Sequence, residues 1–240
     1  MYTILTFLIL VSLVYILKFA MNTVLITGAN RGIGLEFCHQ YKDKGCHVIA
    51  VCRTPSAELN ALDVEVISDI EVSDESAVQK LGERLKGKCI DIAINNAGTM
   101  LEDSINNLDM ESIRKQIEVN AMGPLIITKA LLPLLANPSK LILITSRMGS
   151  LEDNTSGGYY GYRMSKAALN MAGVSLSHDL KDKGIAVGIL HPGFVKTDLT
   201  NHQGNMTTTE SVSGLIQRID NLTLENSGTF WHADGQTLPW

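Results

Sequence analysis

The chain alternates short apolar runs with longer segments in which apolar residues recur at helical spacing. The apolar runs, which predict buried strands, cover residues 23–27, 47–52, 64–69, 91–98, 140–145, 185–190 and 228–232. Helical spacing covers residues 32–45, 75–87, 109–135, 160–183 and 208–220, with a break expected at Gly123-Pro124. Buried strands that alternate with helices are typical of a parallel sheet covered by helices on both faces. We therefore predict one α/β domain, a doubly wound Rossmann domain with a parallel sheet of about seven strands.

Residues 1–20 form a separate hydrophobic leader. No charged residue precedes Lys18, so the leader reaches the lower length limit of a membrane-spanning helix. Lys18 and Arg31, on its carboxyl side, favour a domain that stays in the cytoplasm. Alternatively, Met21 is the natural start, because a predicted strand follows it without a linker. Both interpretations stay open, and the globular domain is expected over residues 21–240.

Composition narrows the classes of function. The 240 residues carry a net charge of −5 and no basic stretch, which argues against a nucleic-acid partner. The four cysteines lie in no metal-binding spacing and the histidines form no ligand pair, so no metal site is predicted. We interpret the four cysteines as buried or idle thiols, which suit a reducing compartment, so the cytoplasm is the expected location. If the leader is an anchor, we expect tethering to the cytoplasmic face of a membrane.

Three glycines follow the first predicted strand in the segment "TGANRGIG", residues 27–34. Gly28 permits a tight turn, Gly32 lets the backbone approach a phosphate, and Gly34 lets the next helix pack on the strand. The amino end of that helix offers unpaired N–H groups to an anion. In this strand–turn–helix context the segment predicts a dinucleotide site.

The segment "YYGYRMSK" places Tyr162 four residues before Lys166, at the start of a predicted helix. This spacing puts a phenol and an ammonium group on one face of the helix. The other unusual clusters all follow predicted strands, and in such folds ligands bind beyond the carboxyl ends of the strands. We interpret Tyr162 as an acid tuned by Lys166, and Tyr159 and Tyr160 as packing or pocket-wall residues.

Four motifs occur in a fixed order: TGxxxGxG at Thr27, NNAG at Asn95, "SRMG" at Ser146 and YxxxK at Tyr162. In this order they resemble the short-chain dehydrogenase/reductase family, from the first strand to the carboxyl end. The segments "YGYRMSKAALN", "HPGFVKTD" and "DGQTLPW" are similar to those of sniffer and C-factor type carbonyl reductases. The resemblance implies reversible hydride transfer between a nicotinamide cofactor and a small-molecule carbonyl or alcohol substrate.

The resemblance implies four catalytic residues, Asn120, Ser146, Tyr162 and Lys166. The phenol of Tyr162 would protonate the carbonyl oxygen as hydride arrives, or take a proton from an alcohol in reverse. Lys166 is expected to lower the pKa of this phenol from about 10 by at most about 3 units. Ser146 would hydrogen-bond the substrate oxygen, with Ser150 as a rival, and Asn120 would hold a water in a proton relay near Lys166.

Two arginines decide the expected cofactor. Arg31 lies in the glycine segment, and Arg53 follows the second strand, where NAD enzymes usually carry an acidic residue. Guanidinium groups without a carboxylate suit a 2′-phosphate, so we expect NADP(H). Asn95 is expected to join the strand ends. The resemblance implies further cofactor contacts at Gly28, Asn30, Gly32, Ile33, Gly34, Asp69, Ile70, Asn96, Ala97, Gly98, Tyr162, Lys166, Pro192, Gly193, Val195 and Thr197.

Other functions share parts of this pattern. A non-catalytic dinucleotide-binding sensor or signalling protein can use the same fold, but an intact Ser146, Tyr162 and Lys166 count against it. A nucleotide-sugar epimerase or dehydratase can share YxxxK, but that branch usually has different glycine spacing and a longer carboxyl-terminal domain. We therefore expect an NADPH-dependent carbonyl reductase. By resemblance, it forms a homodimer or homotetramer through the long helices that begin near Asp109 and Tyr160.

Overall fold

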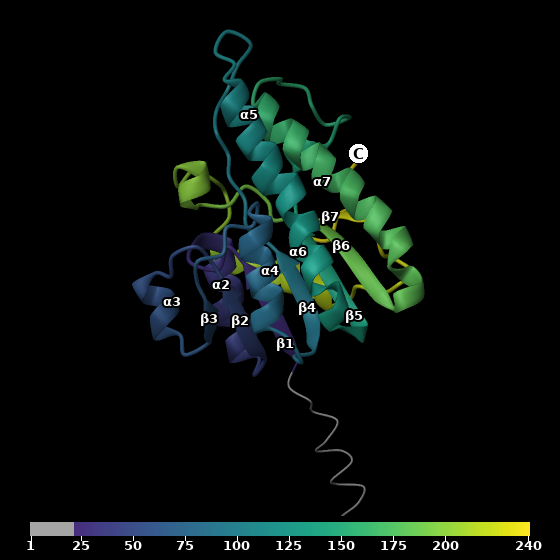
Figure 1. The fold of residues 1–240 in the computed structure, drawn as a ribbon. Helices are drawn as coiled ribbons and strands as arrows, with labels where there is room; N and C mark the ends of the chain where they lie inside the picture. The colour runs from purple at the N-terminus through teal and green to yellow at the C-terminus, as the bar shows by residue number, and fades with distance from the viewer. Residues whose placement is uncertain (1–21) are drawn as a thin grey trace, which may run out of the picture.

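The computed structural model describes residues 22–240, so the predicted leader and Met21 lie outside the described residues. Seven parallel strands form one sheet in the order β3-β2-β1-β4-β5-β6-β7 (Figure 1). The strands are β1 (Thr23–Thr27), β2 (His47–Val51), β3 (Glu65–Ile67), β4 (Ile90–Asn95), β5 (Leu135–Ile144), β6 (Ile185–His191) and β7 (Phe230–His232). The prediction of a doubly wound α/β sheet is confirmed.

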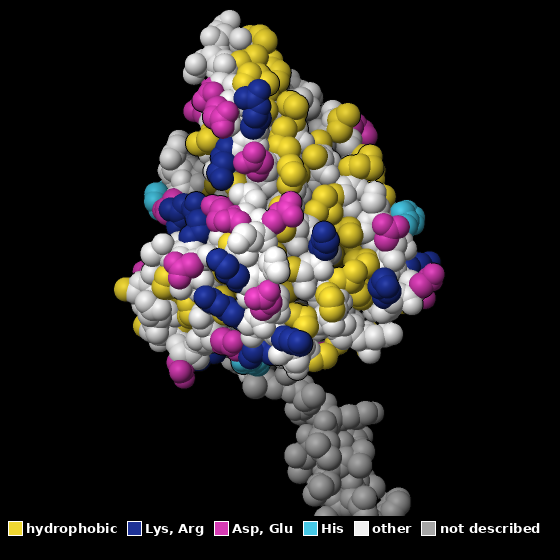
Figure 2. Space-filling view, viewed as in Figure 1, with side chains coloured by type: hydrophobic (Ala, Val, Ile, Leu, Met, Phe, Trp, Pro, Cys, Tyr) yellow, Lys and Arg dark blue, Asp and Glu magenta, His cyan; other side chains and the backbone are white. Residues whose placement is uncertain are grey.

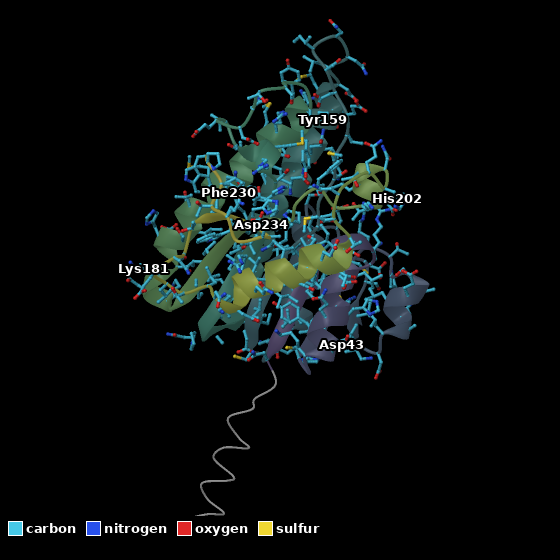
Figure 3. The ribbon with its side chains drawn as sticks, turned by 180° about the vertical axis from the view of Figure 1, so that it is seen from behind. Asp43, Tyr159, Lys181, His202, Phe230 and Asp234 are labelled. Carbon is cyan, nitrogen blue, oxygen red and sulfur yellow. The ribbon has the colours of Figure 1, made fainter. Side chains whose placement is uncertain are left out.

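Helices cover both faces of the sheet. They are α2 (Gly32–Asp43), α3 (Ala57–Ala61), α4 (Glu75–Arg84), α5 (Met110–Ile117), α6 (Gly123–Leu131), α7 (Tyr160–Asp179) and α8 (Thr208–Asp220). Along β1, Val24 and Ile26 pack in the core with α2 and α8, whereas Leu25 packs in the core with α4, α6 and α7. Figure 1 shows α4, α6 and α7 on one face, and the view from behind in Figure 3 shows the yellow-green α8 across the other.

The strand order reverses at one point of the sheet. Strand β1 lies between β2 and β4, so the order of the strands reverses beside it. All strands are parallel, and their carboxyl ends therefore meet at the same edge. In open α/β sheets the loops diverge at such a reversal and leave room for a ligand. The predicted site residues are expected to gather there.

The break predicted at Gly123-Pro124 does not occur. Helix α5 continues through a π-helical segment, Glu118–Met122, into α6. Pro124 has no N–H to donate to the Asn120 carbonyl four residues earlier. The wider π turn accommodates this missing hydrogen bond, and the Gly123 N–H donates to the Glu118 carbonyl. Asn120, a predicted site residue, therefore lies in the widened turn.

Two other elements differ from the prediction. Strand β5 begins at Leu135, before the predicted Lys140, because Leu135 pairs with Ile90 of β4 ahead of a register shift to the Ile92–Lys140 pair. Helix α3 was not predicted. Its first turn is capped by Ser56 Oγ, which accepts the N–H of the buried Leu59 at 3.1 Å. A serine at this position was the available signal.

The continuous helical stretch Met110–Leu134 has the length and hydropathy of a membrane span. It nevertheless packs inside this domain, because its residues Ile113, Ile127 and Leu131 are buried in the described structure. Packing within the domain therefore accounts for part of its apolar character, whereas Met110, Met122 and Leu125 are exposed.

Candidate active site

The turn between β1 and α2 packs tightly against the chain that follows β4. Gly28 has a φ of +66°, and a Cβ there would lie 2.8 Å from Ala97 Cα. A Cβ on Gly34 would lie 2.2 Å from the carbonyl oxygen of Gly28. The Arg31 side chain, at the amino end of α2, does not cap the helix. The turn thus leaves its backbone uncovered by side chains and offers the free N–H groups at the start of α2, the arrangement that binds phosphates.

Asn96 joins the ends of β1 and β4. Its Nδ2 donates to the carbonyl oxygens of Thr27 at 2.9 Å and Gly28 at 3.3 Å. Thr27 Oγ1 in turn accepts the N–H groups of Asn96 and Ala97, both at 3.1 Å. The expectation that Asn95 holds the strand ends is wrong. Asn95 is buried, and its Nδ2 has no hydrogen-bond partner in the described part of the chain.

Tyr162 and Lys166 are both buried on one face of α7. Lys166 Nζ donates to the carbonyl oxygen of Ile144, the last residue of β5, at 3.0 Å. The Ser146 side chain, just beyond β5, lies close enough to the Tyr162 phenol to act on its pKa. Each of the two candidate serines accepts a nearby N–H, Ser146 that of Met148 at 3.2 Å and Ser150 that of Asp153 at 3.1 Å. Of the two, Ser146 is the one that acts on the pKa of Tyr162, so we favour it as the partner of the phenol.

Burial governs the acid–base properties of this pair. It raises the pKa of Tyr162 to about 12, while the hydrogen bond with Ser146 acts in the opposite direction. Burial also lowers the pKa of Lys166 to about 8. The expected lowering of the Tyr162 pKa by Lys166 is not found, because removal from water disfavours the charged form of both groups. Tyr162 is therefore a protonated phenol at neutral pH.

The Asn120 side chain links the chain after β4 to α7. Its Oδ1 accepts the Thr99 N–H at 2.8 Å, and its Nδ2 donates to the Thr99 carbonyl at 2.8 Å and to Ser165 Oγ at 3.0 Å. Ser165 Oγ then donates to the Tyr162 carbonyl at 2.8 Å. The side-chain amide of Asn120 is thus engaged in structure. Its main-chain carbonyl has lost the usual helical donor, because Pro124 has no N–H, and the water that the resemblance implies remains a prediction.

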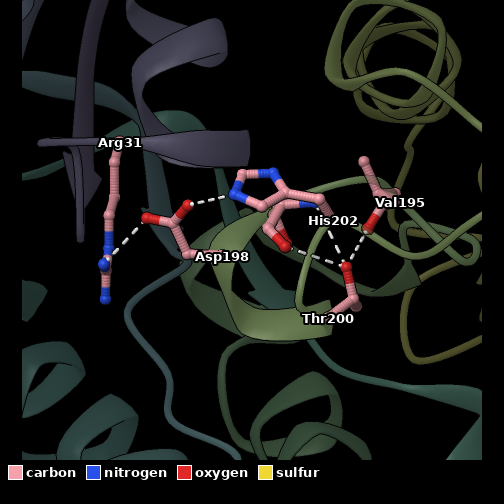
Figure 4. A network of polar contacts seen from close by, with 6 residues as sticks. Arg31, Val195, Asp198, Thr200 and His202 are labelled. Atoms are coloured by element: carbon pink, nitrogen blue, oxygen red, sulfur yellow. Dashed lines mark hydrogen bonds and ion pairs between the residues drawn. The ribbon is translucent and has the colours of Figure 1, made fainter.

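Arg31 and Arg53, the predicted phosphate ligands, each lie beside a carboxylate. Arg31 Nη1 is 2.9 Å from Asp198 Oδ2, and the other oxygen of Asp198 is 3.1 Å from His202 Nε2 (Figure 4). Arg53 Nη1 is 3.2 Å from Glu71 Oε2. No carboxylate follows β2 directly in the sequence, but the fold brings Glu71 there. The arginine side chains are 65% and 71% exposed, and ion pairs this exposed contribute little, so a phosphate can replace the carboxylates.

Asp69 and Ile70, the predicted adenine contacts, lie beside the end of β2. Their N–H groups donate to the main-chain carbonyls of Arg53 at 2.9 Å and Cys52 at 3.1 Å. Asp69 has a φ of 63°, so the chain turns sharply after β3. The turn keeps both residues at the carboxyl edge of the sheet, next to Arg53.

The segment after β6 folds back toward the glycine turn. The Pro192 carbonyl accepts Ser211 Oγ at 2.6 Å, and Val195 forms a parallel bridge with Met206. Thr197 lies beside the glycine turn, since a Cβ on Gly32 would be 3.4 Å from Thr197 Cγ2. The structure therefore gathers the predicted residues along one edge, at the ends of β1 to β6. These are Gly28, Asn30, Arg31, Gly32, Ile33, Gly34, Arg53, Asp69, Ile70, Asn96, Ala97, Gly98, Asn120, Ser146, Tyr162, Lys166, Pro192, Gly193, Val195 and Thr197.

Three residues that shape the site were not predicted. They are Thr27, which holds the chain after β4, Ser165, which links Asn120 to Tyr162, and Asp103, which contacts the start of α7. Thr27 had a signal, because it opens the glycine segment. Ser165 and Asp103 had none, because their partners lie far away in the sequence and only the fold brings them together.

The profile of the short chain dehydrogenase family matches residues 22–208. The chain belongs to this family. Among the relatives of this short-chain dehydrogenase, 1-hydroxy-2-glutathionyl-2-methyl-3-butene dehydrogenase of Rhodococcus sp. (strain AD45) is 45% identical over 226 residues, which cover 92% of this chain and 100% of the relative. C-signal of Myxococcus xanthus is 43% identical over 154 residues, which cover 63% of this chain and 93% of the relative.

Solved structures of carbonyl reductases are similar to this short-chain dehydrogenase. An NADPH-bound carbonyl reductase from chicken fatty liver has a TM-score of 0.84 at 32% identity, covering 92% of this chain and 99% of that one. Carbonyl reductase Sniffer of D. melanogaster has a TM-score of 0.84 at 30% identity, covering 92% of this chain and 100% of that one. The predicted family is confirmed, and the protein is a short-chain dehydrogenase/reductase oxidoreductase.

Proposed function

We propose that this short-chain dehydrogenase reduces a small carbonyl compound with NADPH and that Tyr162 is its general acid and base. One observation carries the proposal. The buried phenol of Tyr162, with Ser146 close by, lies beside the buried amine of Lys166 at the carboxyl edge of the sheet. The hydrogen bond to the Ile144 carbonyl keeps the Lys166 amine beside the phenol, which is where a proton-transfer site needs a cation.

The residues of this chain have distinct parts in the reaction. NADPH, when bound, supplies the hydride for the carbonyl carbon. Tyr162, a phenol at neutral pH, donates its proton to the carbonyl oxygen, which Ser146 orients by a hydrogen bond. Lys166 stabilises the negative charge left on the phenol oxygen, and this matters more in a buried site than in water. In the reverse direction, the phenolate takes a proton from an alcohol.

Three features support NADP(H) as the cofactor. The glycine turn and the amino end of α2 fit a pyrophosphate, and Arg31 and Arg53 lie where a 2′-phosphate would need cations. The chicken liver relative has NADPH bound, and a 25% identical Burkholderia multivorans dehydrogenase/reductase has NADP bound. Asp69, Ile70 and Asn96 to Gly98 would hold the adenosine and ribose, and Pro192 to Thr197 the nicotinamide end.

A substrate screen tests this function. The full chain and residues 21–240 are assayed with aldehydes, ketones, quinones and, in reverse, alcohols, each with NADP(H) and NAD(H). The name of the Rhodococcus relative describes an alcohol next to a glutathionyl thioether, so glutathione conjugates belong in the panel. We expect turnover that depends on NADP(H). No turnover with any member of the panel contradicts the proposal.

A dinucleotide-binding signalling protein is the second candidate, and the likeness to C-signal favours it. It predicts tight nucleotide binding without turnover. The same screen therefore separates the two functions, once the affinity for NADPH is measured by fluorescence titration. Binding without turnover supports the second candidate, and turnover supports the first.

A homodimer or homotetramer is the proposed assembly. Figure 2 shows hydrophobic side chains gathered over α5, α6 and α7, and Met110, Met122, Leu125, Met164 and Met171 are exposed there. An exposed apolar stripe of this kind is common at protein interfaces. Light scattering on residues 21–240 tests the mass. Substituting Met171→Lys should dissociate the assembly, and a monomeric parent contradicts the proposal.

The proposed location is the cytoplasm, with two alternatives for the first twenty residues. If residues 1–20 anchor the chain to a membrane, carbonate washing leaves the protein in the membrane fraction. Release into the soluble fraction contradicts the anchor.

A further inference from the structure

The catalytic helix α7 begins with an unusual cap. Tyr159 precedes the helix in a left-handed conformation, with φ 50° and ψ 43°, and makes no side-chain cap (labelled in Figure 3). The first N–H groups of any helix lack partners within the helix. Tyr162 lies in this first turn, so the position of its phenol depends on how these N–H groups are satisfied.

Asp103 accepts hydrogen bonds from three successive main-chain N–H groups at the start of α7. Its main-chain carbonyl accepts the N–H of Tyr159 at 3.0 Å. Its two carboxylate oxygens accept the N–H groups of Tyr160 and Gly161, the latter at 3.0 Å. Asp103 is 5% exposed and lies 57 residues before Tyr160 in the sequence. The cap of α7 is therefore supplied by the loop that follows β4.

That loop is itself held by α5 and the π-helical segment. Gln116 Oε1 accepts the Leu101 N–H at 3.0 Å, and Asn120 binds both main-chain groups of Thr99. Helix α7 crosses closely here, since a Cβ on Gly161 would lie 2.5 Å from Gln116 Nε2. The chain is thus fixed at Thr99 and Leu101, just before Asp103 reaches α7.

We propose that Asp103 is a positioning residue that holds the first turn of α7, and with it the Tyr162 phenol, in the geometry for proton transfer. This inference rests on the proposed function. The negative carboxylate also suits the positive end of the helix dipole. A catalytic group displaced by about 1 Å can cost about 10²-fold in rate, so a frayed first turn should reduce turnover sharply.

Asp74 provides a matched control, because it caps α4 by the same chemistry away from the site. Its Oδ1 accepts the N–H groups of Ser76 at 2.8 Å and Ala77 at 3.2 Å. If capping serves stability alone, Asp74→Ala and Asp103→Ala should both lower the melting temperature and leave turnover per folded molecule unchanged.

The experiment uses the full chain with Asp103→Ala, Asp103→Asn and Asp74→Ala. For Asp103→Ala we expect a fall in kcat of about 10- to 100-fold with NADPH affinity within about threefold of the parent. The isotope effect with NADPH deuterated at the transferred position should rise, because the chemical step becomes slower. Asp103→Asn keeps one oxygen acceptor and should lose less activity. Should the alanine variant fail to fold, the asparagine variant decides by the same measurements.

Hydrogen exchange gives an independent readout. Amides of residues 159–163 should exchange at least about tenfold faster in Asp103→Ala, with no matching change in Asp74→Ala. Unchanged kcat and isotope effect in both Asp103 variants, or unchanged exchange at the start of α7, overturns the inference. Failure of the parent enzyme to turn over any substrate would overturn the proposed function instead, and the exchange data would still show whether Asp103 orders Tyr162.

Discussion

The ammonium nitrogen of Lys166 lies 5.7 Å from the centroid of the Tyr162 ring. Both residues belong to one face of α7, and both are buried. The amine is held by the Ile144 carbonyl, so it stays beside the ring and cannot extend into solvent. This fixed relationship between a phenol and an amine is the basis of the predictions on catalysis.

Substituting Tyr162→Phe should lower turnover by about 10³-fold, because it removes the proton donor and leaves the ring in place. NADPH affinity should change little, since the glycine turn is untouched. Steady-state kinetics and fluorescence titration measure the two effects. Tyr160→Phe is the matched control, because Tyr160 is exposed at the start of the same helix and should keep full activity. Surviving activity in Tyr162→Phe would show that the acid is misassigned.

The pH profile of carbonyl reduction should have a basic limb near pH 8. Burial lowers the pKa of Lys166 to about 8 and raises that of Tyr162 to about 12. Below pH 8 the amine is charged and the phenol is protonated, so kcat/KM should be flat. Above pH 8 the amine loses its proton, and kcat/KM should fall while Tyr162 remains a phenol. A profile that stays flat to pH 10 contradicts this assignment.

Substituting Arg53→Ala should raise the Kd of NADPH by about 10- to 100-fold and that of NADH by less than about threefold. The guanidinium would hold the 2′-phosphate, which NADH lacks. Arg114→Ala is the control, because Arg114 is an exposed arginine paired with Glu111 at 3.4 Å on α5. Equal losses for both nucleotides would remove the case for phosphate recognition by Arg53.

Acid should destabilise the fold partly through His191, at the end of β6. Its ring stacks edge-on against His232 at 5.0 Å, and burial followed by the neighbouring cations lowers the pKa of His191 to about 3. The pKa of His191 in the folded protein is below the ordinary value of about 6.5. The neutral imidazole therefore contributes to the free energy of unfolding above pH 6.5, and this contribution is lost as the pH falls through 3. His191→Asn should reduce the loss of unfolding free energy between pH 6.5 and 3.

The control for this measurement is His178→Asn, since His178 is exposed on α7. It should leave the acid dependence of stability unchanged. Urea unfolding at a series of pH values gives the free energies. If the free energy of unfolding depends on pH identically in the parent and in His191→Asn, protonation of His191 does not contribute to the loss of stability in acid.

Several site residues could be predicted because their signals are local. Gly28 and Gly34 lie within one turn, and the spacing of Tyr162 and Lys166 needs only a helix. Other features escaped because they depend on distant partners. Glu71 comes beside Arg53 through the packing of β2 against β3, and Asn96 takes the role expected of Asn95 because its amide faces Thr27.

The sequence by itself determined the seven-stranded sheet, the edge at which the site lies and the order of its motifs, because apolar periodicity and glycine turns act over a few residues. Only the tertiary structure decided the pKa of Tyr162 and the cap that Asp103 places on α7. Burial and long-range hydrogen bonds arise from residues far apart in the chain, and no local pattern encodes them.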